Sequence, residues 1–185
     1  MIVQSLPKRY DSVAILLHWL IGVSILAVGL VELFRRDIFA KGDPIRDALG
    51  AIHQPAGTVI FALILLRIVW RLTHPAPAMP GTMRGWEMTV AKLTHLCLYA
   101  AMIAVPILGI ATTFARGKPI DFGLFQIAGP AFAVLSKEGA RTAKDIHEWL
   151  GQAILALAFF HAAAGLWHHY GRRDDVLTRM LPQRS

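Results

Sequence analysis

The stretch that decides the fold is residues 146–170, which read IHEWLGQAILALAFFHAAAGLWHHY. It carries histidines at positions 147, 161 and 168, and these are separated from one another by multiples of seven residues. Because each residue of an α-helix turns by about 100°, seven or fourteen residues return to nearly the same face. We therefore expect one helix on which His147, His161 and His168 share a face.

The first two of these histidines are expected at two depths of a membrane. A rise of about 1.5 Å per residue places His147 and His161 ~21 Å apart along the helix axis. The hydrocarbon layer is about 30 Å thick, so each imidazole would lie near one of its edges. Ionisable residues inside membrane helices are rare and usually functional. The pattern thus predicts a site at each of two levels.

The composition predicts a single-domain integral membrane protein. The chain has 185 residues, and 55% of them are hydrophobic. Four long apolar runs are typical of transmembrane helices. The expected spans are 13–33, 51–72, 91–114 and 146–170. The predicted fold is all-α, an integral membrane four-helix up-and-down bundle formed by residues 1–185.

Several classes of function are disfavoured by the cysteine content and the charge. The single cysteine, Cys97, excludes a disulfide within the chain and a thiolate-held metal cluster. The net charge of +7 lies outside the spans, and no basic region interleaves aromatic residues as in nucleic-acid binding. We therefore expect contact with membrane lipids and no nucleic acid. No cleavable signal sequence precedes the first span, which we expect to stay as an anchor.

The distribution of basic residues does not decide the orientation. Of the 19 Lys and Arg residues, nine fall on each side of the expected bundle, and Arg67 lies within the second span. The first side includes Lys8 and Arg184. A bacterial membrane protein normally has an excess on its cytoplasmic side. The second side is therefore unusually basic, and such a surface would attract a small anion.

The up-and-down topology predicts which histidines share a depth. His18, His95 and His161 fall towards the first side, and His53 and His147 fall towards the second. A six-coordinate b-type haem is held by two axial imidazoles, which here would come from opposed helices at equal depth. We predict two haem b groups, one held by His53 and His147 and the other by His18 and His161. His95 is the alternative to His18.

Other interpretations of these histidines stay open. Single histidines near helix ends are commonly interfacial residues. A zinc or copper site is also conceivable, although metal sites usually gather three or four ligands at one point. The alternative from another class is a histidine-based metal-ion transporter, which predicts a purified protein without visible-light absorption.

Two further residues are candidates for contact with a cofactor or substrate. Arg67 follows His53 by fourteen residues, so it shares that face at the other depth. It could pair with a haem propionate or extend to the membrane edge. His168 follows His161 by seven residues, so it lies beyond the haem predicted at His18 and His161. It could donate a proton to a quinone. Alternatively, His168 and His169 could stabilise a helix C-terminus.

The chain resembles the bacterial cytochrome b-561 family over nearly its whole length. The motifs that carry the resemblance are Leu17-His18-Trp19, Ile52-His53, Val69-Trp70-Arg71-Leu72, His95, Val105-Pro106-Ile107-Leu108-Gly109, Arg116-Gly117-Lys118-Pro119, His161-Ala162-Ala163-Ala164, His168-His169-Tyr170 and Arg179-Met180-Leu181-Pro182.

The resemblance implies a multi-pass di-haem protein of the bacterial inner membrane with both termini in the cytoplasm. His18 and His161 would hold the haem on the cytoplasmic side, and His53 and His147 the haem on the periplasmic side. Within the family the likeness is to the superoxide oxidases. These pass electrons from periplasmic superoxide through both haems to ubiquinone.

The same resemblance implies residues at a quinone site. His168 matches a histidine implicated there, and the loop from Gly85 to Thr89 matches that region in position. The predicted activity is superoxide:ubiquinone oxidoreductase, with no catalytic residue assigned beyond these groups. The alternative is a cytochrome b electron-transfer subunit that serves a soluble redox partner. Whether the quinone is ubiquinone or menaquinone, and whether the protein is a monomer or a homo-oligomer, stays open.

Overall fold

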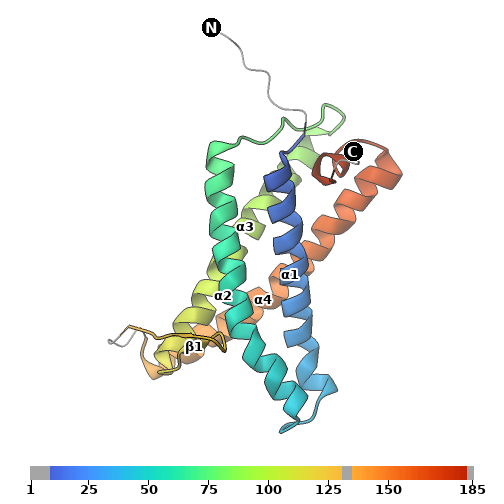
Figure 1. Ribbon diagram of the computed structural model, residues 1–185. Coiled ribbons are helices and arrows are strands. Elements are labelled where there is room, and N and C mark those ends of the chain that lie inside the picture. Colours follow the sequence, from blue (N-terminus) through green and yellow to red (C-terminus); the bar gives the residue numbers. More distant parts are fainter. Residues whose placement is uncertain (1–8, 131–134, 183–185) are drawn as a thin grey trace.

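The computed structural model describes residues 9–130 and 135–182, and long helices dominate it (Figure 1). The charged residues Lys8 and Arg184, counted above on the first side, lie outside these ranges. The elements are α1 (Ser12–Ile38), α2 (Pro44–Thr73), α3 (Gly85–Ala115), β1 (Ile120–Asp121), β2 (Gln126–Ile127), α4 (Lys137–Leu166), the π-helix η1 (Trp167–Arg172) and the 3₁₀-helix η2 (Thr178–Met180).

The predicted all-α, four-helix membrane bundle is confirmed. Each of α1 to α4 is long and apolar enough to cross a membrane, the last together with η1. At most 22% of the most apolar window of any helix is buried inside the bundle. Large apolar side chains such as Leu16 and Phe159 therefore face outward, as lipid-facing residues do, while the backbone polar groups are satisfied within each helix.

The helices are longer than the expected apolar spans, because helical hydrogen bonding continues beyond the lipid until a cap ends it. Residues 34–38 and 44–50 were expected in a polar connection, but they belong to α1 and α2. Asp43 caps α2, since its side chain accepts a hydrogen bond from the Ile45 N–H. Ser136 caps α4 in the same way, ten residues before the apolar run begins.

The main packing pairs are α1 with α2 and α3 with α4, and the α2–α3 and α1–α4 contacts close the bundle. A core cluster forms where α1 meets α2, from Leu17 and Ile21 on one helix and Ile60 and Ile64 on the other. Because α2 and α4 are not among these packed pairs, side chains of these two helices can face one another across the interior of the bundle.

The two described ends of the chain meet at one end of the bundle. The Arg9 guanidinium donates to the Thr178 and Leu181 carbonyls, and the Trp19 indole donates to the Met180 carbonyl at 2.6 Å. We call this the inner end.

The opposite end, which we call the outer end, carries the α1–α2 connection and the β1–β2 hairpin (Figure 1). Ile120 of β1 is buried, and β1 packs on α2. The Gly123 N–H and the Gln126 amide donate to the Asp121 carboxylate, and they hold the pKa of that group below its ordinary value. This bonding orders the hairpin turn.

Candidate functional site

His53 of α2 and His147 of α4 face one another in the outer half of the bundle, and we call them the outer pair. Their ring centroids are 6.0 Å apart, and the ring planes are inclined at 84°. A metal ion with bonds of about 2 Å to an imidazole nitrogen on each side separates two ring centroids by roughly 6 Å. The outer pair therefore has the spacing of two axial ligands to one metal.

A cavity of about 440 Å³ surrounds the outer pair and is lined by all four long helices. Its volume lies within the ~300–1,000 Å³ range of cofactor and ligand sites. Gly57 and Gly151 line it, and a Cβ atom added at either glycine would meet no atom within 4 Å. The cavity therefore has the space that a flat macrocycle needs between helices.

His147 is held in one tautomer by the backbone of α3. Its Nδ1 lies 2.8 Å from the carbonyl oxygen of Val105, which can only accept a hydrogen bond. Nδ1 must therefore carry the proton, and Nε2 keeps the lone pair that a metal ligand needs. Gly109, one turn further along α3, permits this contact because a Cβ there would come within 3.0 Å of the ring.

Three histidines meet at the inner level, and we call them the inner cluster. His161 of α4 lies 6.1 Å from His18 of α1, centroid to centroid, with the planes at 75°. It also lies 5.3 Å from His95 of α3, with the planes at 67°. The structure thus brings both candidate partners of His161 to one place. The His18–His161 spacing is nearly that of the outer pair.

Arg67 is buried beside the inner cluster. Only 7% of the residue is exposed, and its Nη1 donates to the Ala14 carbonyl at 2.7 Å. Ala14 lies one helical turn before His18, so Arg67 is at the level of that histidine. Because the side chain is buried in the bundle, it does not extend to the membrane edge, which was one of the two expectations.

The charge of Arg67 lacks an acidic partner within the part of the chain that the structure describes, where no carboxylate lies within 4.0 Å of it. A buried, unpaired charge is costly. An anionic group of a bound cofactor would remove that cost, so the surroundings of Arg67 fit a haem carboxylate.

His168 lies at the inner end and bonds to a carboxylate that the sequence analysis missed. Its Nδ1 donates to Asp174 Oδ2 at 2.6 Å, and both side chains are largely buried. The α-helix ends at Leu166, and the chain continues as the π-helix η1. The α-helix on which His168 was expected to share a face with His147 and His161 therefore ends two residues before His168. The sequence feature that could have predicted this contact is that the carboxylate of Asp174 follows the His168-His169 pair closely along the chain.

The segment Gly85–Thr89 is helical, and the expectation of a loop there is wrong. It forms the first turns of α3, where Glu87 at the third helical position accepts a hydrogen bond from the Arg84 N–H. Both Gly85 and Thr89 are exposed. Arg172 of η1 forms an ion pair with Glu87 at 3.0 Å. This bond places the start of α3 at the same end of the bundle as His168.

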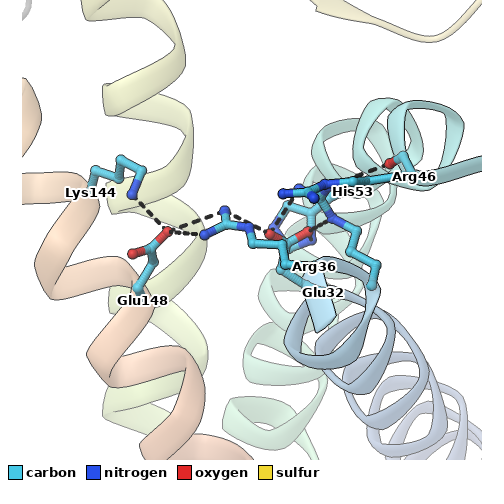
Figure 2. Close-up of polar contacts among 7 residues, drawn as sticks. Glu32, Arg36, Arg46, His53, Lys144 and Glu148 are labelled. Atoms are coloured by element: carbon cyan, nitrogen blue, oxygen red, sulfur yellow. Dashed lines mark hydrogen bonds and ion pairs between the residues drawn. The ribbon is translucent and has the colours of Figure 1, made fainter. Parts of the chain in front are cut away.

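Charged residues gather beside His53 (Figure 2), and most of them line the cavity of the outer pair. Glu32 accepts hydrogen bonds from Arg35 and Arg36, and Glu148 accepts from Arg36 and Lys144. With Arg46, this outer cluster has four basic residues and two acidic ones. The sequence predicted a basic surface on this side, but it did not predict that Glu32 lies near His53.

Imidazoles that face one another at two depths of a four-helix membrane bundle define a class, the membrane cytochromes b, in which histidines from facing helices hold haem. The chain belongs to the prokaryotic cytochrome b561 family, whose family model matches residues 9–183. Members are membrane electron-transfer proteins that bind b-type haem, so the predicted haem, oxidoreductase class and bacterial membrane are confirmed at that level.

Individual relatives cover almost the whole chain. Cytochrome b561 homolog 1 of Escherichia coli is 31% identical over 96% of this chain and 99% of its own length. The probable superoxide oxidase CybB of Yersinia pestis is 31% identical over 96% of this chain and 98% of its own length. Cytochrome b562 of Cereibacter sphaeroides is 29% identical over 95% and 96%.

Proposed function

We propose that this protein is a di-haem superoxide oxidase of the bacterial inner membrane, with both termini in the cytoplasm. It oxidises superoxide to dioxygen at its outer end and passes the electrons through two haem b groups to ubiquinone at its inner end. The observation that carries the proposal is the pairing of imidazoles at two depths. One relative, from Yersinia pestis, is named a probable superoxide oxidase.

The ligand assignment follows from the ring spacings. His53 and His147 hold the outer haem, and His18 and His161 hold the inner haem, since these two pairs have nearly equal centroid separations of 6.0 and 6.1 Å. Arg67 binds a propionate of the inner haem. The haem supplies the one-electron redox chemistry, while the chain supplies ligation, orientation and electrostatics.

The charge at the outer end supports superoxide as the electron donor. Superoxide is a small anion, and the basic residues that line the outer cavity outnumber the acidic ones, which would raise its encounter rate. The basic residues are Arg35, Arg36, Arg116 and Lys144, and the acidic ones are Glu32 and Glu148. Two superoxide ions each lose one electron and leave as dioxygen. One quinone takes both electrons together with two protons and becomes a quinol, so two redox levels suit the accumulation of the electrons.

The inner end supports a quinone site. The Nδ1 proton of His168 is bonded to Asp174, which leaves Nε2 for a ligand. His168 could then exchange a proton with a quinone oxygen while the carboxylate holds the ring. Gly85 and Thr89 lie at the same end, on the exposed start of α3. We assign ubiquinone as the acceptor and these residues as its surroundings.

Stopped-flow mixing tests the electron donor. When the oxidised protein is mixed with superoxide, we expect the reduced haem b absorption to appear faster than superoxide disappears by spontaneous dismutation. Added ubiquinone should reoxidise the haem within the same experiment. In the control, superoxide dismutase present before mixing should abolish the haem reduction. Haem reduction no faster than spontaneous dismutation would reject the superoxide assignment and leave the cytochrome assignment intact.

A second candidate function is electron transfer with a soluble redox protein. The outer cluster that would attract superoxide would also attract an acidic protein surface, and the Escherichia coli relative is named only a cytochrome b561 homolog. Rapid haem reduction by an acidic redox protein, without reduction by superoxide, would favour this function. Loss of activity on purification of the chain alone would favour it as well.

Gly109→Ala tests the outer pair without removing a ligand. The new Cβ would lie 3.0 Å from Cε1 and 3.2 Å from Nδ1 of His147, so the ring must move and weaken its bond to Val105. We expect about tenfold faster loss of one haem, because partners that orient a metal ligand typically contribute 10–100-fold to affinity. Haem transfer to an apoprotein acceptor measures this rate.

The control for Gly109→Ala is Gly81→Ala, in the connection between α2 and α3. Gly81 is exposed, its φ angle is not positive, and a Cβ there would meet no atom within 4 Å. We expect Gly81→Ala to lose haem at the unaltered rate. Equal rates of haem loss in the two variants would contradict the importance of the His147 orientation.

A further inference from the structure

The two histidines of the outer pair are held differently. His147 donates its Nδ1 proton to the Val105 carbonyl, but Nδ1 of His53 is buried and has no hydrogen-bond partner within the described chain. A buried polar group without a partner destabilises the folded protein. Metal-ligating histidines almost always donate their second ring N–H to a carboxylate, a carbonyl or a water molecule. His53 therefore needs an acceptor that the cofactor-bound protein can supply.

The acceptor within reach is Glu32 of α1. Its Oε2 lies 3.9 Å from His53 Nδ1 (Figure 2). Oxygen and nitrogen at this separation are in ion-pair range but about 1 Å beyond an ordinary hydrogen bond. Small rotations of two side chains can close that gap. Both side chains are about three-quarters buried, so bulk water does not compete freely for either group.

Glu32 is held in place by two arginines of its own helix. Arg35 donates to both carboxylate oxygens, at 2.6 and 3.0 Å, and Arg36 donates at 3.1 Å. Arg35 itself lies against Gly50 of α2, where a Cβ would come within 3.2 Å of the guanidinium group. The carboxylate is therefore fixed beside α2, near the histidine that the same helix presents to the cavity.

We propose that Glu32 is a positioning residue for the outer haem. Its carboxylate accepts a hydrogen bond from the Nδ1–H of His53, which fixes the imidazole ring and increases the electron donation of the His53 Nε2. The proposal rests on the assignment of His53 as a haem ligand. The outer pair would then be asymmetric, because His53 donates its hydrogen bond to a carboxylate and His147 donates to a peptide carbonyl. A carboxylate acceptor stabilises the ferric state and lowers the midpoint potential of this haem.

The competing explanation is that Glu32 only neutralises Arg35 and Arg36. Glu148 provides a matched control, because it belongs to the same outer cluster and pairs with Arg36 and Lys144, at 3.3 and 2.7 Å. Replacing either glutamate with glutamine removes one negative charge at the outer end. Only the change at position 32 replaces the carboxylate beside His53 with a neutral amide oxygen, which is a weaker acceptor.

The experiment compares purified, haem-loaded full-length protein with Glu32→Gln, Glu32→Asp and Glu148→Gln. Equilibrium redox titration gives the midpoint potentials, and electron paramagnetic resonance of the ferric protein reports the ligand field. We expect Glu32→Gln to retain its haem, to raise the midpoint potential of one haem more than Glu148→Gln does, and to shift the low-spin signal of that haem. Glu148→Gln should leave that signal unchanged.

Glu32→Asp separates position from charge and supplies a second variant if Glu32→Gln folds poorly. It keeps the negative charge but withdraws the carboxylate by one methylene, out of reach of His53. We expect the same shift of the low-spin signal as in Glu32→Gln. An unshifted signal in Glu32→Asp, or equal changes in Glu32→Gln and Glu148→Gln, would overturn the proposal.

The variant His53→Ala distinguishes failure of the positioning role of Glu32 from failure of the proposed function. If His53→Ala loses one haem while the Glu32 variants behave like the unaltered protein, only the role of Glu32 is overturned. If His53→Ala retains all of its haem, His53 is not a ligand and both the ligand assignment and the positioning role are overturned.

Discussion

Replacing His147 with alanine is expected to remove one haem from the protein and leave the other in place. The variant loses one axial imidazole of the outer pair, and His53 alone, 6.0 Å away across the cavity, cannot hold a six-coordinate haem. The inner cluster lies about 21 Å further along α4, at 1.5 Å per residue, and should be undisturbed. The pyridine haemochrome absorbance per mole of protein should fall to half.

The control for this experiment is His169→Ala. His169 lies on η1 at the inner end, where its ring contacts Tyr170 with centroids 4.7 Å apart, and it belongs to neither level. This variant should keep the full haem content. The double variant His53→Ala/His147→Ala should lose no more haem than either single variant, because the two residues act as one unit. Full haem retention by His147→Ala would contradict the assigned pairing.

The second large effect is expected at the inner cluster. His161→Ala should lose the inner haem, because both candidate partners depend on this residue. His18→Ala should lose it too, since the His18–His161 separation of 6.1 Å nearly equals that of the outer pair. His95→Ala should keep both haems and change only the spectrum or the potential of the inner one. Haem content and redox titration measure these outcomes.

His18 and His95 serve as controls for each other. They lie on two different helices that both pack on α4, at similar distances from His161, and only one of them can complete its ligation. Haem loss in His95→Ala with retention in His18→Ala would reverse the assignment and identify the 5.3 Å pair as the ligands. Retention in both single variants would reject an inner haem held by this cluster.

Much of the architecture could be predicted from the sequence because it depends on local chemistry. Apolar runs long enough to cross a bilayer predicted four spans, and α1, α2, α3 and α4 with η1 contain them. The helix ends were less predictable, since hydropathy reports the lipid-facing part of a helix while caps such as Asp43 and Ser136 decide where it begins. The start of α3 was taken for a loop for the same reason.

The candidate site was only partly predictable. Fourteen-residue spacing on α4 placed His147 and His161 on one face, and the structure sets each against an imidazole of another helix. The proximity of Glu32 to His53 and of Asp174 to His168 was not anticipated. The first contact joins two helices, and the second depends on a π-helix that interrupts the α-helical register.

By itself, the sequence determined the membrane bundle and the two levels of paired histidines, because hydropathy and a 3.6-residue period are properties of single segments. Only the tertiary structure decided that His95 joins His18 beside His161, that Arg67 is buried without an acidic partner in the described chain, and that Glu32 lies near His53. These relations depend on how helices cross and rotate against one another, and residues distant along the chain leave no periodic trace of the contacts they make.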